Sequence, residues 1–278
     1  MQSIVEFAQR TFAIVIWNAG ELVVFGLLMF VLQWLLPQDK QQKSWDSVCN
    51  IDLAYSFILA ISTPFFYALP IALSEWVIQL FPTLHLWSAN VEQQWHWSLN
   101  LLLAVFLIDF VSYWRHRLMH MKWLWPIHLI HHSSTRLNWL SNERFHPLNY
   151  LISTSINTVA VVFFLGPEIA LYAAFLRRLY NFYIHANVRI SYGVLAYVFV
   201  SPQFHHWHHS SDIKAANKNY CTFFSCIDWL FGTYYLPKDG AFPAKMGTKD
   251  SPEEGLWQQT VYPFRQWWRW IMPTKIRN

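Results

Sequence analysis

The amino-acid sequence predicts an all-α integral membrane protein, a helical bundle with a histidine-rich helical cap on its cytoplasmic side. Hydrophobic residues make up 54% of the 278-residue chain and charged residues only 13%, whereas soluble domains carry about 25% charged residues. Aromatic residues account for 19%, with 17 Trp, which excludes a disordered chain because such chains are poor in aromatic residues. Mean hydropathy is only +0.19, so a polar, water-facing part must accompany the membrane helices.

Four apolar segments are long enough to enter a membrane, since a spanning helix needs about 20 mostly apolar residues. They cover residues 11–36, 53–81, 97–114 and 147–185. Pro37 follows the first segment and ends it. We expect each segment to be helical, and together they predict the bundle.

Proline and glycine interrupt two of these segments. Pro64 and Pro70 are expected to kink the second helix. The fourth segment divides at Gly166, Pro167 and Glu168 into two halves, each of them short for a full span. We therefore expect a helical hairpin there, which dips into the membrane or barely crosses it.

Basic residues predict the orientation of the bundle. The loop after the first segment holds Lys40 and Lys43, whereas residues 82–96 contain no Lys or Arg. Of the 20 basic residues, 17 lie from Arg115 onward. By the positive-inside rule, the first loop and the basic half of the chain are cytoplasmic and residues 82–96 lie on the far side. The basic, aromatic stretch 265–270 is expected to rest among the lipid headgroups.

The histidines form three motifs that carry the chemical signal. An HxxxH motif contains His116 and His120. Two HxxHH motifs follow, made of His128, His131 and His132, and of His205, His208 and His209. Spacings of three and four place side chains on one face of a helix, so each motif can present two or three imidazoles to one point. His85 and His96 lie on the expected far side and are interpreted as bystanders.

Such a set of histidines predicts a metal site. Imidazole binds iron, zinc, copper and nickel, and one metal takes about four to six donors. The three motifs, together with His185 near the end of the fourth apolar segment, supply enough donors for two metals. Two close metals with open positions indicate oxygen-activating iron. Two zinc ions, or buried histidines without a metal, are the alternatives.

At these motifs the sequence resembles the fatty acid hydroxylase and sterol desaturase superfamily. Four stretches are similar to its first and second histidine boxes, its Arg-x-His-Pro element and its last box: Asp109–His120, Leu124–Ser133, Arg144–Pro147 and Phe204–Ser210. Two further stretches resemble the signature that trails the last box, Asn219–Tyr220 and Asp228–Tyr234. The resemblance covers about residues 97–236, and the order, spacing and trailing signature agree together.

The resemblance implies a membrane-bound, O2-dependent, non-haem di-iron oxidoreductase that hydroxylates or desaturates a lipid C–H bond. The implied metal ligands are His116, His120, His128, His131, His132, His185, His205, His208 and His209. It also implies three parts: membrane-anchoring helices in residues 1–96, a fatty acid hydroxylase-like catalytic domain in 97–236, and a cytoplasmic or interfacial tail in 237–278. The lipid, the carbon attacked and the choice between hydroxylation and desaturation are not indicated.

Several residues near the boxes have open roles. Some members of the superfamily carry a further histidine where this chain has Asn181, so either Asn181 or His146 is a candidate metal ligand. Asp109 is expected to accept an N–H from a ligand histidine, with packing against an Arg as the alternative. Asp228 and Asn219 could support ligands in the same way or could cap a nearby helix or turn.

The chain's motifs also restrict its partners. With only eight Gly it has no glycine-rich nucleotide loop, and no b-type cytochrome sequence is fused to it. Electrons must then come from a separate carrier, ferredoxin-like or a b-type cytochrome with its reductase, and a basic cytoplasmic face favours an acidic one. A membrane lipid is the expected substrate, and nucleic acid is not an expected partner.

Two rival functions remain at the level of the sequence. One is a membrane protein that binds or transports two metals, zinc or iron, without oxygenase activity. Its ligands should lie midway through the bilayer, whereas nearly all these histidines lie in the polar half of the chain. The other is a haem protein, which needs only two axial histidines and leaves the rest unexplained.

Overall fold

The computed structural model describes residues 2–83, 85, 94–252 and 255–272, and the regular structure in these ranges is helical. Residues 84 and 86–93, which belong to the predicted far-side loop, lie outside the described residues. Four long helices are α1 (Gln2–Leu35), α2 (Ser47–Leu80), α4 (Trp97–Met119) and α6 (Pro147–His185). The shorter elements are α5 (Trp125–His132), η1 (Trp139–Glu143), η2 (Gly193–Tyr197), α7 (Pro202–His208), η3 (Ile213–Ala215), α8 (Ser225–Leu230) and α9 (Leu256–Ile271).

The long helices contain four segments that are apolar and long enough to cross a membrane. They are Phe12–Leu35, Ser47–Leu80, Trp97–Met119 and Pro147–Phe164. Their exposed surfaces are largely apolar, as in Trp17 and Trp34 on α1, which suits contact with lipid. The prediction of an all-α membrane bundle is therefore confirmed.

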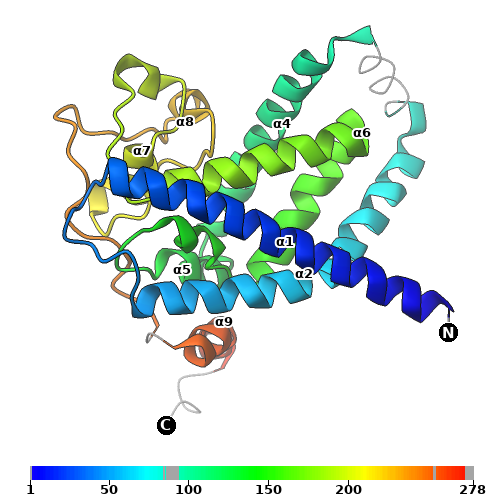
Figure 1. Ribbon diagram of the computed structural model, residues 1–278, viewed down its shortest axis with the longest axis horizontal. Helices are drawn as coiled ribbons and strands as arrows, with labels where there is room; N and C mark the ends of the chain where they lie inside the picture. The colour runs from blue at the N-terminus through cyan, green and yellow to red at the C-terminus, as the bar shows by residue number, and fades with distance from the viewer. Residues whose placement is uncertain (1, 84, 86–93, 253–254, 273–278) are drawn as a thin grey trace.

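Helix α2 begins at a capping aspartate and bends along its length. Asp46 accepts hydrogen bonds from the backbone N–H groups of Val48 and Cys49, at 2.8 and 3.2 Å, which satisfies donors that have no partner inside the helix. In Figure 1 the light-blue half of α2 runs beside α1, and its cyan half turns away. Pro64 and Pro70 lie inside this helix, so the predicted kink is confirmed.

Helix α6 folds back on itself. Asn149, near its start, accepts a hydrogen bond from His128 Nδ1 at 2.9 Å, and His185, its last residue, lies 3.3 Å from His131 through their Nε2 atoms. A straight helix would separate Asn149 and His185 by about 54 Å at a rise of 1.5 Å per residue. Because both meet α5, the two arms of α6 form the predicted hairpin, visible as its green and yellow-green halves in Figure 1.

The hairpin differs from the prediction in one respect. We expected residues 166–168 to separate two helices, but helical structure continues through them and α6 is a single element. Glycine and proline are the residues that allow a sharp bend inside a helix. The sequence therefore predicted the change of direction correctly and the interruption of the helix wrongly.

Polar residues inside α1 are explained by their contact with the returning arm of α6. Arg178 Nη1 donates to Asn18 Oδ1 and to Glu21 Oε2, both at 2.7 Å. Its Nη2 lies 3.5 Å from Glu143 Oε2, on η1. Membrane-buried charges are costly unless paired, so these contacts fix the register of α1 against α6.

A buried ion pair joins α2 to the chain that follows η1. The guanidinium of Arg144 is 1% exposed and donates to the carboxylate of Asp52, which is 0% exposed. Arg144 also donates to the carbonyl of Val48 at 3.1 Å. Removing one partner of such a pair costs about 3–5 kcal/mol, because the other charge stays buried. Arg144 therefore stabilises the fold.

Helices α1 and η1 touch at a glycine. A Cβ placed on Gly26 would lie 2.7 Å from the ring of Trp139, whereas one on Gly20 would meet nothing within 4 Å. Trp139 in turn packs at 5.7 Å on Phe182 of α6. The close approach of α1 to this tryptophan thus requires glycine at position 26 but not at position 20.

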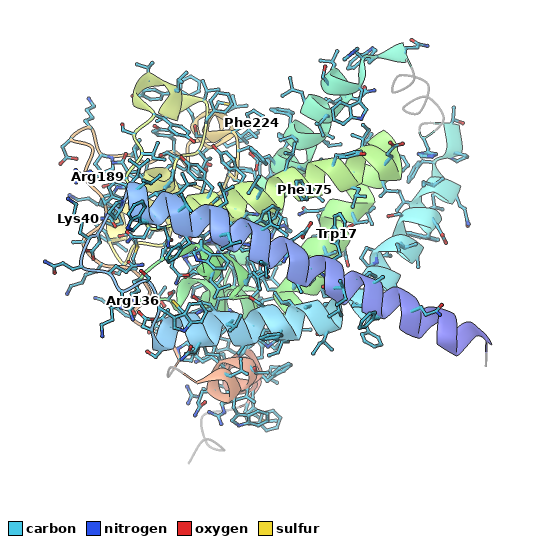
Figure 2. The ribbon with its side chains drawn as sticks, in the orientation of Figure 1. Trp17, Lys40, Arg136, Phe175, Arg189 and Phe224 are labelled. Carbon is cyan, nitrogen blue, oxygen red and sulfur yellow. The ribbon has the colours of Figure 1, made fainter. Side chains whose placement is uncertain are left out.

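The cap consists of residues 120–146 and 186–252, which lie at one end of the bundle. This end contains α5, α7 and α8 and receives the ends of α1, α4 and α6 (Figure 1). Lys40, Arg136 and Arg189 are labelled at the same end in Figure 2, away from Trp17 on α1. These three basic residues thus lie beside the cap.

Candidate metal centre

Nine histidines gather at the junction of the bundle and the cap, and they are the nine that the sequence predicted as ligands. Within each of two groups, one potential ligand atom per residue lies within 4.8 Å of all the others. The first group consists of His116, His120, His128, His132 and His208. The second group consists of His131, His185, His205 and His209.

The HxxHH spacing explains how one short helix serves both groups. His128 and His132 are four residues apart on α5, on one face of the helix, and both belong to the first group. His131 lies between them in sequence, faces differently and belongs to the second group. Helix α7 and its C-cap divide in the same way, because the pair spaced by four joins the second group and the third histidine joins the first.

The Nε2 atoms in the first group converge on one another. His116 Nε2 lies 2.9 Å from His128 Nε2 and 3.0 Å from His208 Nε2, and His132 Nε2 lies 3.2 Å from His128 Nε2. His120 Nε2 is buried without a hydrogen-bond partner. Five imidazole nitrogens therefore border one small space.

The second group repeats this geometry. His185 Nε2 lies 3.0 Å from His205 Nε2 and 3.3 Å from His131 Nε2, and His209 Nε2 lies 3.2 Å from His205 Nε2. All four residues are buried. His185 Nδ1 donates to the backbone carbonyl of Asn181 at 2.7 Å, so its Nε2 carries the lone pair.

Hydrogen bonds to carbonyl groups fix the tautomers of two histidines in the first group. His116 Nδ1 donates to the carbonyl of Tyr220 and His208 Nδ1 to the carbonyl of Lys218, both at 2.7 Å. A carbonyl only accepts, so Nδ1 carries the proton and each Nε2 presents a lone pair. Two lone pairs 3.0 Å apart cannot hydrogen-bond each other, and a bound cation is what satisfies both. The residues therefore fit a metal.

Spacing and protonation agree with metal ligation. With metal–nitrogen distances of about 2.1 Å, ligands at right angles are about 3.0 Å apart, close to the spacings in both groups. Burial lowers the pKa of His128 to about 3 and that of His208 to about 4. Both rings are therefore neutral near pH 7, which is the form that binds a metal.

Asp228 holds the segment on which these tautomers depend. Its carboxylate accepts the backbone N–H groups of Tyr220 and Cys221, at 2.8 and 2.9 Å, and the hydroxyl of Thr233 at 2.7 Å. The carbonyl of Tyr220 is the acceptor for His116. Asp228 therefore supports a histidine through the backbone.

Asp109 holds the continuation of that segment. Its carboxylate accepts the backbone N–H groups of Thr222, Phe223 and Phe224, at 2.9, 3.0 and 2.8 Å. We expected it to accept an N–H from a ligand histidine, and this is wrong, because its two oxygens are engaged by the backbone. Five consecutive amides, from Tyr220 to Phe224, thus bind two buried carboxylates.

Two asparagines shape the same segment. Asn217 and Asn219 have positive φ values of 57° and 62°, a conformation that asparagine adopts more readily than other non-glycine residues. The Asn219 amide donates to the carbonyls of Phe204 and Tyr235, at 2.9 and 2.7 Å. Asn219 therefore connects this loop to α7. Its amide nitrogen donates to backbone carbonyls and not to a histidine ring.

His146 and His206 lie outside both groups. His146 Nε2 donates to the carbonyl of Thr260 on α9 at 3.1 Å, and its Nδ1 accepts from the N–H of Leu148 at 3.2 Å. Both ring nitrogens of His146 are thus engaged, with no lone pair left for a metal. His206 Nε2 donates to the carbonyl of Ala186 at 3.2 Å.

The two expected bystanders are remote from the metal groups. His85 Nδ1 donates to the carbonyl of Phe163, at 2.8 Å, near the bend of α6. The ring of His96 caps the first turn of α4 by accepting from the N–H of Ser98. Their predicted position away from the cluster is confirmed.

Fold and site together define a helical membrane protein with two groups of histidines that could hold metal ions. Residues 101–233 match the family model described as fatty acid hydroxylase. The predicted resemblance to this family is confirmed.

Three relatives illustrate the family. The ornithine lipid hydroxylase OlsE of Rhizobium tropici is 26% identical over 93% of this chain and 78% of its own length. The alkylglycerol monooxygenase of Homo sapiens is 27% identical over 75% of this chain and 45% of its own length. A methylsterol monooxygenase of Arabidopsis thaliana is 28% identical over 49% of this chain and 52% of its own length. No solved structure matches the chain.

These relatives bear on the choice between functions. The chain covers only about half the length of the two eukaryotic relatives. Members of the family are lipid hydroxylases and monooxygenases, so the predicted class of membrane oxidoreductase is confirmed. The alternative of a metal-binding or transport protein without oxygenase activity is not supported.

Proposed function

We propose that this chain is an O2-dependent lipid hydroxylase whose nine clustered histidines hold two iron ions. The observation that carries the proposal is the pair of histidine groups with converging Nε2 atoms. Neutral imidazole donors with spacings near 3.0 Å favour a five- or six-coordinate ion, which suits iron better than four-coordinate zinc. The assignment of the nine as ligands is part of this proposal.

The reaction consumes two electrons and two protons from outside the chain. One lipid C–H bond and one O2 become one C–OH group and one water. The iron ions, when bound, supply the activation of O2. The protein's own histidines would hold the two ions, and Asp109 and Asp228 fix the backbone that orients His116.

The substrate belongs to the membrane. Four apolar helices and the lipid-oxidising family indicate a lipid that reaches the site from the bilayer. OlsE covers most of this chain, so we propose ornithine lipids as the first substrates to test, with alkylglycerols as the second. Hydroxylation is favoured over desaturation because the named relatives are hydroxylases and monooxygenases.

We propose that the histidine groups face the cytoplasm and receive electrons from a separate protein. Lys40, Arg136 and Arg189 lie at the end of the bundle that carries the groups (Figure 2), as the positive-inside rule requires of a cytoplasmic face. The same charges favour an acidic carrier, either ferredoxin-like or a b-type cytochrome. Residues 1–96 would anchor, 97–236 would catalyse and 237–278 would form the interfacial tail.

A single preparation tests the proposal. The protein is purified without oxygen, its iron is counted, and it is given ornithine lipid, a chemical reductant and isotopically labelled O2. We expect about two non-haem irons per chain and a lipid that gains one labelled oxygen atom. His208→Ala should abolish both results. Zinc in place of iron, or a product whose new oxygen comes from water, would overturn the proposal.

A further inference from the structure

A pocket of about 390 Å³ opens beside the first histidine group. Its lining includes Trp114, Arg117, Leu118, His120, Met121 and Asn217. Small-ligand sites span about 300–1,000 Å³, so this volume takes a head group with adjoining carbons and not a lipid with two full acyl chains. Most of a lipid bound here would stay outside the pocket.

Part of the pocket lining is apolar and exposed. Trp114 and Leu118, near the end of α4, are 41% and 47% exposed, and Met121 just beyond it is 59% exposed. Helix α4 is one of the four segments that are apolar and long enough to cross a membrane, so these exposed apolar side chains at its end suit contact with lipid. Acyl chains can lie along them while the polar part of the lipid enters the pocket.

The same lining carries a cation that has no acidic partner among the described residues. Arg117 is the charged residue, apart from histidine, among those that line the pocket, and it forms no ion pair with any described carboxylate. Its guanidinium lies 5.7 Å from the ring centre of Trp114 and donates to the hydroxyl of Tyr113 at 3.1 Å. Two contacts thus hold the group in place, and guanidinium binds carboxylate and phosphate through paired hydrogen bonds.

Sequence spacing relates this cation to the metal groups. Arg117 and His120 are three residues apart at the end of α4, so their Cβ atoms are about 5–6 Å apart. His120 lines the pocket and belongs to the first group. The second group is fully buried. An acidic group on Arg117 therefore places the nearest part of its lipid against the first group.

We infer that Arg117 binds the acidic group, phosphate or carboxylate, of a membrane lipid, and that oxidation falls in the half of the lipid nearest to that group. This inference rests on the proposed function for its second half only. Its first half is a binding statement that holds with or without iron. The middle and the methyl end of the chain stay along Trp114 and Leu118, away from the metals.

Binding to the metal-free full chain tests the first half. Native mass spectrometry in detergent measures the affinity for three single-chain lipids: a lysophosphatidic acid, a fatty acid and a neutral monoacylglycerol. Arg117→Gln should lower the affinity for both acidic lipids about 10- to 100-fold, the loss expected for hydrogen bonds to a charged group. The affinity for the neutral lipid should be unchanged. Arg117→Lys should recover part of the loss. The acidic lipid whose affinity falls more shows whether the site prefers a phosphate or a carboxylate.

The matched control is Lys122→Gln. Lys122 lies close by and packs over the rings of Trp123 and Trp270, at 5.9 and 5.4 Å, but it does not line the pocket. Its loss should leave all three affinities unchanged. Equal weakening by both variants, or unchanged acidic-lipid binding in Arg117→Gln, would overturn the inference.

Product analysis of the iron-loaded protein tests the second half. Tandem mass spectrometry locates the new hydroxyl, and we expect it in the half of the lipid next to the acidic group. A hydroxyl near the methyl end would overturn this assignment. Because the binding measurement needs no metal, a chain without iron that still shows Arg117-dependent binding would refute the proposed function and leave the lipid site standing.

Discussion

Asp228→Asn is the sharpest test of how the protein positions its metal ligands. The substitution preserves shape but exchanges one carboxylate oxygen for an NH2 group. With the remaining oxygen on the N–H of Tyr220 and the hydroxyl of Thr233, the new NH2 group faces the N–H of Cys221. Two donors then oppose each other in a site where Asp228 is 0% exposed.

The size of the effect follows from these contacts. Losing one hydrogen bond to a charged acceptor costs about 1.5–3 kcal/mol, and leaving a buried N–H unpaired costs about 1–3 kcal/mol. A total of about 3–5 kcal/mol corresponds to a fall in Tm of roughly 10 °C for a chain of this size. The displaced carbonyl of Tyr220 no longer orients His116, so metal affinity should fall about 10- to 100-fold.

The assay combines thermal unfolding of the metal-free protein with a metal titration, both in detergent at pH 8. Burial raises the pKa of Asp228 to about 6, so the carboxylate is ionised at that pH. Asp212→Asn is the control, because Asp212 is exposed and accepts one backbone N–H, that of Lys214, at 2.9 Å. Its loss should cost about 1 kcal/mol or less. Equal shifts in both variants, or lower stability with unchanged metal affinity, would refute the positioning role.

Three further predictions follow from single side chains. His131→Ala should empty the second group of metal, while His85→Ala should keep the wild-type metal content, as elemental analysis would show; equal contents would contradict the assignment. Burial lowers the pKa of His146 in the folded protein, whereas in the unfolded chain this pKa is about 6.5. As the pH falls below about 6.5, the unfolded chain therefore takes up a proton that the folded protein does not. The contribution of His146 to stability is complete above a pH of about 6.5 and is lost as the pH falls. His146→Gln, which can still donate to the carbonyl on α9, should reduce the pH slope of the Tm, and an unchanged slope would show that this ring does not titrate on unfolding. Gly26→Ala should destabilise the protein by about 1–3 kcal/mol, because the added methyl group overpacks against the tryptophan of η1. Gly20→Ala should cause no such loss, because its methyl group meets open space. Equal shifts of the Tm in the two variants would argue against the contact at Gly26.

Local signals in the sequence predicted much of the molecule. Long apolar runs identify membrane helices because the bilayer sets their length. The Gly166–Pro167 pair predicted the turn in α6 because these residues allow bends. Spacings of three and four predicted converging histidines because they repeat the helical period, and the structure brings all nine together.

Features that depend on distant parts of the chain were not predictable. The division of α5 between two metal groups depends on where the returning arm of α6 places His185. Nothing in the sequence around Asp109 indicates its backbone hydrogen-bond donors. The first of these, the N–H of Thr222, is 113 residues away. Asn18 and Glu21 look like defects in an apolar helix until Arg178 is seen opposite them. Such pairings follow from tertiary packing, which no local period reports.

The division of the ligands along the chain sets an order for assembly. Both groups need residues from α7, which follows the last membrane-crossing segment. During synthesis the helices can therefore enter the bilayer before either group is complete. The first group then lacks only His208, while the second lacks both His205 and His209. The proposed ligand assignment therefore makes metal binding the final step of maturation, which would join α4, α5, α6 and α7 only after the whole bundle is in the membrane.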